Sequence, residues 1–453
     1  MNEFETLAAS SLKEASFGSF LVIPLKWTDT MPHLEELGKP LPVTTMDLTE
    51  PVKKMFNRQD EYRLLNRYYM GKDLIQSRLV PASEHSGLKT LAVNSTEAGA
   101  NGFHQLSDAD GPADGARYFT LESAWLYVYR THVAFLCLEI HYDDICIMQD
   151  ISNLGYSDIS SCYYACYEDG TWVPFAFDNQ IDGLCRSLGF ESFAAAGVSP
   201  LMEAFLYHVS VSPKRFRKLK TARQICFNQH LMDRFDTALK DRSEEDIHYV
   251  YSVKDQALGS YRWGCCVTSQ TISYAVGRSD NDLDDEMHQQ AEDGLPLVTL
   301  ALYQKYTSLI FSEQLSILEK RNLKRLGELK RSMMEFKAFE VIEPAMLTRW
   351  YNVRMIYQHL LDYNGVSKAI DSIDGKISML AEHQASIRAQ RSNTLMGLIT
   401  IFGLVSILAS VLQIINLLED GGSIFWQVSF ASMIVMAVIA VLVLINNRKA
   451  MHL

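Results

Sequence analysis

The sequence predicts an α+β (α/β) domain, followed by a long-helix stalk and a two-helix transmembrane hairpin at the C-terminus. Two observations carry this prediction. Two long segments, Leu395–Leu418 and Ile424–Ile445, contain no Asp, Glu, Lys, Arg or His. A bilayer core about 30 Å thick is crossed by about 20 apolar helical residues, so each segment is long enough to span it. The residues before them mix β-branched or aromatic runs with helical patterns, as a folded domain with a hydrophobic core does.

The charges that flank the two segments predict their orientation. Basic residues lie before the first segment and after the second, whereas the short loop between them has two acids: Arg388, Arg391, Arg448 and Lys449 against Glu419 and Asp420. The positive-inside rule places both termini in the cytoplasm. The N-terminal stretch MNEFETLAAS has neither basic residues nor an apolar run, so we expect no signal peptide. The expected location is therefore the inner (plasma) membrane, with two passes and a large cytoplasmic part.

Composition excludes several functions. The net charge of −12 argues against direct nucleic-acid binding, which needs a basic surface. The eight cysteines would face a reducing compartment, and their spacing lacks the partners of a zinc site, so we expect neither disulfides nor a bound metal. The sequence has no Gly-x-Ser-x-Gly, His-Glu-x-x-His, phosphate-loop or Rossmann pattern. We therefore expect no catalytic residues and no enzyme, with His132, His141 and His208 as ordinary structural residues.

Residues 1–295 read as the cytoplasmic α/β sensor domain. We expect a strand at 17–27, a helix at 53–78 and a loop at 94–116. A β-hairpin follows at 124–142, where two aromatic and β-branched runs flank Thr131 and His132. Residues 150–167 look helical, residues 171–177 look like a strand, and three strand-like pieces occupy 247–276.

The stalk, residues 296–394, reads as three helices at about 295–339, 345–363 and 366–394. The transmembrane helices are expected at 395–418 and 424–445, with a cytoplasmic tail at 446–453. Asn364-Gly365 is a typical helix stop. After it, no strong helix breaker precedes Leu418, so the third helix should continue into the membrane without interruption.

This long helix has two faces. One is an apolar seam that includes Val366, Ile370, Ile373, Ile377 and, in the span, Leu398, Val405 and Leu412. The opposite face, offset by about 200°, is mostly polar or small. Several hairpins around an axis could enclose a pore lined by this second face, with Met396 forming a constricting ring: Asn393, Met396, Thr400, Gly403, Ser406, Ser410, Gln413 and Asn416. The alternative is that Ser406-x-x-x-Ser410 only lets two helices pack closely.

This layout resembles the CorA-type two-span channels and transporters. The resemblance is clearest from about Leu295 to the end and covers the N-terminal domain only in broad class. It implies a homo-oligomer, a pentamer in that family, whose first span lines the pore. The family's Gly-Met-Asn filter is absent, because the corresponding place reads Ile414-Ile415-Asn416-Leu417-Leu418. Only Asn416 matches, which argues against selectivity for magnesium.

A CorA-like pore without the filter, joined to an enlarged sensor domain, is similar to the membrane effectors associated with type III CRISPR systems. That resemblance implies antiviral defence through a channel opened by a nucleotide second messenger, of the adenylated S-adenosylmethionine (SAM-AMP) type. No other cofactor is implied. The alternative function is a CorA-type divalent metal (magnesium) transporter, and a membrane-anchored enzyme or scaffold is a third possibility.

Two stretches could bind an anionic nucleotide. The segment SPKRFRKLKTAR concentrates bases in an acidic chain, among them Lys214, Arg215 and Arg217. The segment YRWGCC places Arg262 and Trp263 beside Gly264, and an aromatic ring with a guanidinium can hold a base and its phosphate. For the first segment, the alternative is a basic patch that faces anionic lipid or an acidic neighbouring domain. For the second segment, the alternative is a core tryptophan beside a surface arginine. The acidic run 278–293 lacks the glycine and glutamate that a calcium-binding loop requires.

Overall fold

The computed structural model describes part of the chain: residues 15–27, 34–79, 87–93, 117–142, 163–195, 198–213, 215–217, 219, 222–223, 225–227, 248–252, 254, 256, 259–277, 282–317, 323–418 and 430–431. The chain divides into two compact units. The first comprises Met1–Ile317 with Arg331–Ile373, and the second comprises Leu318–Lys330 with Asp374–Leu453.

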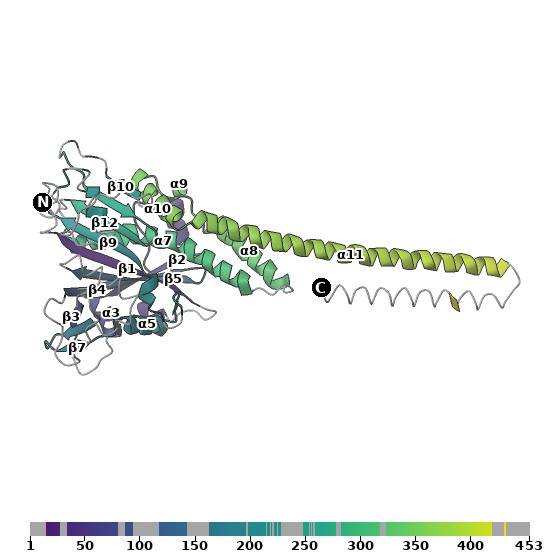
Figure 1. Cartoon of the computed structure of the whole chain (residues 1–453), viewed down its shortest axis with the longest axis horizontal. Helices are drawn as coiled ribbons and strands as arrows, with labels where there is room; N and C mark the ends of the chain where they lie inside the picture. Colours follow the sequence, from purple (N-terminus) through teal and green to yellow (C-terminus); the bar gives the residue numbers. More distant parts are fainter. Residues whose placement is uncertain are drawn as a thin grey trace, which may run out of the picture. The chain divides into compact units, whose positions relative to one another are not determined.

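The first unit is built on one 12-stranded sheet in the order β10-β11-β12-β9-β1-β5-β4-β3-β6-β7, with β2 paired to β4 and β8 paired to β1 (Figure 1). The β12–β9 pair is parallel, and the other strand pairs are antiparallel. The sheet is therefore mixed and mostly antiparallel, as in an α+β domain. The strands are β1 Ser16–Lys26, β2 Leu65–Gly71, β3 Leu88–Val93, β4 Arg117–Tyr129, β5 Val133–Tyr142, β6 Tyr163–Tyr167, β7 Trp172–Pro174, β8 Glu191–Ser192, β9 Phe205–Ser212, β10 His248–Tyr251, β11 Trp263–Val267 and β12 Thr271–Gly277.

The predicted hairpin is confirmed as β4 and β5. Their side chains are almost all buried, which fits runs of β-branched and aromatic residues in a strand covered on both faces. The turn closes at His132, whose φ of 63° lies in the left-handed region. The ring of Trp27 packs on the imidazole of His132, with centroids 4.3 Å apart, so the turn is held against the end of β1. The predicted strand at 17–27 and the three strands within 247–276 are confirmed as well.

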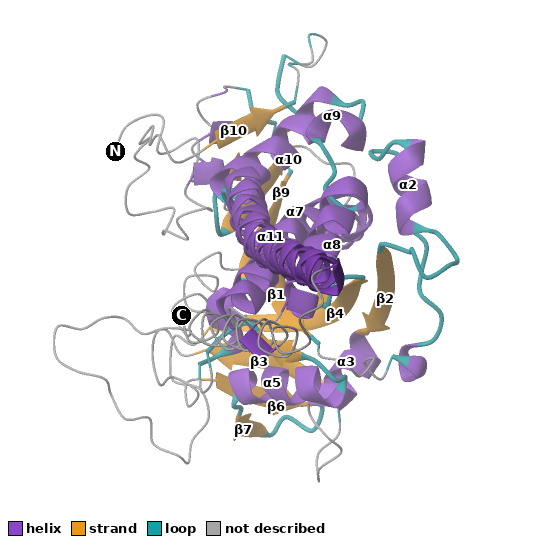
Figure 2. Cartoon of the chain, turned by 90° about the vertical axis from the view of Figure 1, so that its right-hand side faces the viewer, coloured by secondary structure: helices purple, strands orange, loops and turns teal. Residues whose placement is uncertain are grey.

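Two helical layers cover the sheet. On one face, α3 (Lys72–Leu79) and α5 (Phe177–Ser187) bury apolar side chains in a common core with alternate residues of β1, including Leu21, Ile23 and Leu25. On the other face, α7 (Leu283–Ile317) contacts β1, β4, β5 and β9. Figure 2 shows α5 lying along β6 and β3. The remaining helices are α2 Glu50–Phe56, α8 Leu323–Phe339, α9 Pro344–Leu347, α10 Tyr351–Tyr363 and α11 Val366–Leu418, with 3-10 turns η1 Glu35–Leu37 and η3 Pro200–Glu203.

Several local predictions were wrong. The expected helix at 53–78 is α2, then β2, then α3. Strand β2 forms there because its backbone pairs with β4 from Leu65 to Gly71, and this long-range pairing outweighs the helical look of the charged residues around it. Residues 163–167 are the fully buried strand β6 rather than helix, and only Trp172–Pro174 of the strand expected at 171–177 forms. The expected loop at 94–116 lies outside the described residues.

The helices beyond the sheet also differ in their limits. The expected helix at 295–339 is represented by α7, which begins earlier at Leu283, and by the separate helix α8. The expected helix at 345–363 is divided into α9 and α10. By contrast, α11 is one continuous helix of 53 residues with the predicted limits. The outer loop and most of the second span lie outside the described residues.

Candidate functional site

The pore-lining candidates lie on α11, in the second unit. Met396 is 66% exposed, and the described part of the chain buries none of the most apolar window of this helix. The hydroxyls of Thr400 and Ser410 donate hydrogen bonds to the carbonyl oxygens of Met396 and Ser406, each at 2.9 Å. A hydroxyl bonded to its own helix in this way needs neither water nor a second helix as partner. The polar face is therefore compatible with a pore and with close helix packing.

The remaining candidates continue this face along the helix. Gly403 lies between Thr400 and Ser410, and Gln413 lies beyond Ser410. Asn393 precedes Thr400 by about two turns. Asn416 lies in the last turn of α11, one turn beyond Gln413. The side chains of the last three residues of α11 lie outside the described part.

The two predicted ligand-binding segments, far apart in sequence, become neighbours. Phe216 forms an antiparallel bridge with Tyr261, and the Tyr261 N–H donates to the Phe216 carbonyl at 3.0 Å. Arg215 and Arg217 therefore flank Phe216, which pairs with the first residue of the YRWGCC segment. Arg217 and Arg262 are exposed and Arg215 is half-buried, whereas Lys214 lies outside the described residues. The structure thus brings three of the four predicted cationic residues to one edge of the sheet.

The other two residues of this set have structural roles. Trp263 is half-buried, and its ring packs on Tyr274 with centroids 5.5 Å apart. Gly264 lies under the ring of Tyr251: a Cβ at this position would be 2.7 Å from Tyr251 Cδ1. The glycine is therefore required by the close approach of this ring, and no ligand is needed to explain it.

Behind this edge lies an aromatic layer that was not predicted from the sequence. The rings of Tyr249 and Tyr251 on β10 lie nearly parallel at 6.0 Å, and the guanidinium of Arg223 lies 4.6 Å from the Tyr249 centroid. Burial raises the pKa of Tyr251, and the neighbouring Cys226 thiol contributes in the same direction. The signal was present in the sequence, because Arg223 ends the basic segment, but its position against β10 depends on the fold.

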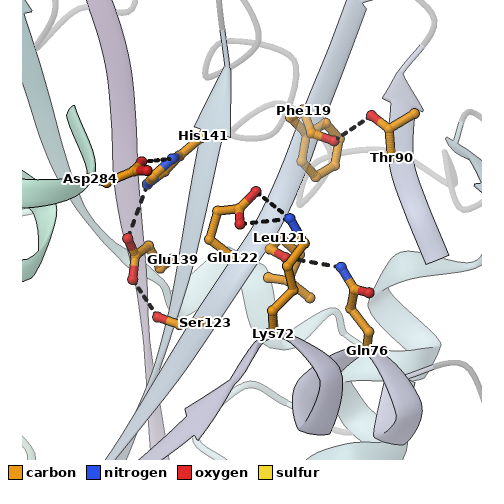
Figure 3. A network of polar contacts seen from close by, with 10 residues as sticks. All are labelled: Lys72, Gln76, Thr90, Phe119, Leu121, Glu122, Ser123, Glu139, His141 and Asp284. Carbon is orange, nitrogen blue, oxygen red and sulfur yellow. Dashed lines mark hydrogen bonds and ion pairs between the residues drawn. The ribbon is translucent and has the colours of Figure 1, made fainter. Parts of the chain in front are cut away.

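A network of polar side chains on β4, β5, α3 and α7 was not predicted (Figure 3). His141 on β5 contacts two carboxylates: its Nε2 lies 3.0 Å from Glu139 Oε1 and its Nδ1 lies 3.2 Å from Asp284 Oδ1. The hydroxyl of Ser123 donates a short hydrogen bond to the second oxygen of Glu139. His141 is thus a link between the sheet and the first turn of α7, which is more than the isolated structural residue expected from the sequence.

Lys72 and Glu122 form the second part of this network. Lys72 Nζ lies 2.9 and 2.7 Å from the two carboxylate oxygens of Glu122, at a register shift in β4 between Leu121 and Ser123. Burial alone would raise the pKa of Glu122, but the hydrogen bond from Lys72 outweighs it and the pKa is lowered. Gln76 Nε2 donates to the Leu121 carbonyl at 3.2 Å, so α3 is joined to the irregular part of β4.

A buried network connects the β4–β5 turn to the helical layer. The Tyr303 hydroxyl donates to the carboxylate of Glu340, just beyond α8, and accepts from Thr131 Oγ1 at 2.7 Å. Arg130 Nη1 lies 3.6 Å from the same carboxylate. Nearby on α7, Gln304 donates to the hydroxyl of Tyr357 on α10. These contacts join the turn, α7, the end of α8 and α10 within the first unit.

An acidic group lies where the loop before α2 meets α7. Thr45 Oγ1 donates to Asp293, and Asp47 lies close enough for the two carboxylates to interact. Burial, and then the charge of Asp293, raise the pKa of Asp47 to about 6. Burial also raises the pKa of Glu286, whose carboxylate accepts from Gln290 at 2.9 Å. Within the described ranges, no group of three His, Cys, Asp or Glu side chains could hold a metal ion.

A serine–histidine pair lies in the core. Ser19 Oγ is 2.9 Å from His208 Nδ1 and 2.8 Å from the Tyr142 hydroxyl. Both Ser19 and His208 are 0% exposed, so no substrate can reach the serine oxygen. The pair therefore stabilises the junction of β1, β5 and β9.

No family model matches the sequence, and no curated protein matches it. Among solved structures, one match is the CorA magnesium transporter from Methanocaldococcus jannaschii, at 7% sequence identity and a TM-score of 0.21. The match covers 56% of this chain and 93% of that protein.

Proposed function

We propose that this protein forms a ligand-opened channel in the inner (plasma) membrane. The single observation that carries the proposal is α11, a continuous 53-residue helix whose final part, Leu395–Leu418, contains no charged residue. None of its apolar window is buried against the described remainder of the chain. Such a surface needs a bilayer or other copies of the helix around it. The polar face of Thr400, Ser406 and Ser410 favours an oligomer in which this face lines a pore.

The ligand we propose is a nucleotide messenger of the SAM-AMP type, acting in type III CRISPR antiviral defence. The resemblance in layout to those effectors supports the class of ligand. The edge of the sheet that carries the exposed Arg217 and Arg262 and the half-buried Arg215 supports the location, because cations beside aromatic rings suit a phosphate attached to a base. Opening requires that the ligand bind the open state more tightly than the closed state.

The test is ion flux from liposomes that contain the purified full-length protein. Addition of SAM-AMP should release ions, and Arg217→Glu with Arg262→Glu should abolish this release. Arg349→Glu is the matched control, since Arg349 is an exposed arginine remote in sequence from this edge. A flux that is unchanged in the double variant would remove this edge as the ligand site. The absence of flux with any nucleotide would remove the ligand-opened reading.

The pore face has its own test. A narrow ring of methionine side chains can hold a pore shut by excluding water. Met396→Ser should therefore leak ions without a ligand, whereas Val405→Ser, on the opposite face of α11, should remain closed. The reverse result would mean that the apolar seam lines the pore.

The second candidate function is magnesium transport. The position of Asn416 in the last turn of α11, where the CorA-type filter carries its asparagine, is the observation in its favour. Expression of the protein in cells that lack magnesium uptake decides between the two. Rescue of growth that is lost in Asn416→Ala would favour the transporter; no rescue is expected.

A further inference from the structure

His141 on β5 links the sheet to the first turn of α7. Both ring nitrogens of His141 face carboxylate oxygens, with Nε2 at 3.0 Å from Glu139 and Nδ1 at 3.2 Å from Asp284 (Figure 3). A carboxylate oxygen only accepts hydrogen bonds, and neutral imidazole has one N–H. The two contacts are therefore satisfied together only when the group holds one proton beyond the neutral ring and two ionised acids.

We propose that Glu139, His141 and Asp284 form a proton-operated latch, which holds the first turn of α7 on the sheet when His141 is protonated and releases it when the proton leaves. With both nitrogens protonated, the ring donates to both carboxylates, and each hydrogen bond joins two charged groups. When the proton leaves, one nitrogen presents a lone pair to a carboxylate, and that contact becomes repulsive.

Burial decides which contact is lost. The side chain of Glu139 is 11% exposed and that of Asp284 is 83% exposed. An ionised carboxylate deprived of a donor costs more free energy when it is buried than when water can reach it. The remaining N–H therefore stays on Nε2 and donates to Glu139, which also accepts from Ser123. Asp284 then turns into solvent, where water and the positive end of the α7 dipole stabilise its charge.

The movement is confined to the start of the helix. Met287, one turn further on, is fully buried beside β1: a Cβ added at Gly18 would lie 2.7 Å from Met287 Sδ. Glu286 is likewise buried and bonded to Gln290. These contacts are independent of His141, so the rest of α7 stays on the sheet.

The sign of the pH dependence follows from the charges around the ring. Glu139 from β5, Asp284 from α7 and Glu122 from β4 all favour the imidazolium, while Lys72 from α3 is bonded to Glu122 and offsets its charge. The latched state binds the proton, so the latch is closed on the acidic side and opens as the pH rises.

Hydrogen exchange of the full-length protein tests the latch. The peptide that covers 283–290 is followed at about pH 5 and about pH 8.5, at and beyond the two ends of the range in which histidine side chains ordinarily change charge, after correction for the intrinsic exchange rate. Protection in the wild type should fall by about two- to fivefold at the higher pH, the range expected for an ion pair with one exposed partner. In Asp284→Asn the protection should be the same at both pH values, because an amide can accept a hydrogen bond from the protonated ring nitrogen or donate one to the unprotonated nitrogen.

Asp285→Asn is the matched control. Asp285 is an exposed acid in the same turn, and its backbone N–H donates to Asp282 Oδ1 at 2.9 Å. This variant removes the same charge from the helix end and should keep the pH dependence of the wild type. Equal protection of the wild-type peptide at both pH values would overturn the proposal. So would an Asp285→Asn variant that loses the dependence as completely as Asp284→Asn.

Discussion

Replacing Tyr303 by phenylalanine should destabilise the first unit through one buried carboxylate. Tyr303 is fully buried and Glu340 is 3% exposed. The hydroxyl donates to Glu340 and accepts from Thr131 Oγ1 at 2.7 Å, whereas the ring stacks on Tyr129 at a centroid distance of 4.2 Å. Tyr303→Phe keeps the ring contacts and removes only the oxygen. Glu340 is then left with Arg130, at 3.6 Å, as its ion-pair partner.

A hydrogen bond to a buried charged group contributes about 1.5–3 kcal/mol to the free energy of unfolding, so we expect a loss of about 2 kcal/mol. The loss should depend on pH. Burial raises the pKa of Glu340, and the Tyr303 hydroxyl lowers it, so removing the hydroxyl raises it further. A carboxyl group whose pKa is raised on folding binds its proton more tightly in the folded state, so acidification favours folding. The deficit of Tyr303→Phe should therefore shrink as the pH falls.

The assay is thermal unfolding of the purified full-length protein, followed by tryptophan fluorescence at several pH values. Tyr68→Phe is the control: Tyr68 is 7% exposed, and its hydroxyl makes no hydrogen bond within the described part of the chain. It should change stability by less than about 0.5 kcal/mol, as for most substitutions that remove no specific interaction. A deficit that is equal in the two variants, or independent of pH, would refute the assignment of the loss to Glu340.

Two further predictions concern groups whose pKa is shifted in opposite directions. Burial and the charge of Asp293 raise the pKa of Asp47 to about 6, so Asp47→Asn should stabilise the protein by about 1 kcal/mol near neutral pH, a value reduced for partial exposure. That gain should shrink as the pH falls below about 6 and vanish below the ordinary aspartate pKa of 3.8, where the carboxyl group is mostly protonated in both states. Burial and the stacked ring of His248, at 4.1 Å, lower the pKa of His359 to about 4. The unfolded chain then binds the proton first, so the wild type should lose stability between about pH 6.5 and 4, and His359→Phe should lose less over the same range. Melting temperatures of the wild type and the two variants across this pH range test both predictions. A pH dependence of the opposite sign for either variant would contradict the burial assigned to the replaced group.

The sequence alone determined the helices and strands that are specified by residues close together in the chain. Helix α11 has its predicted limits because a glycine stop precedes it and no breaker follows before Leu418. The β4–β5 hairpin was predictable from two buried runs around Thr131 and His132. In both cases the periodicity of apolar residues and the turn chemistry point to the same structure, so no distant contact is needed to choose it.

Only the tertiary structure decided the elements and sites that depend on distant partners. Strand β2 exists because β4 offers it a free edge, and β6 because β3 does, so neither could be recognised from its own residues. The basic segment and Arg262 meet through one bridge, between Phe216 and Tyr261. The polar network that joins Lys72, His141 and Asp284 gathers residues from four elements. Its chemistry arises from distances of about 3 Å between side chains far apart in the chain, and such distances are set by how the sheet and helices pack.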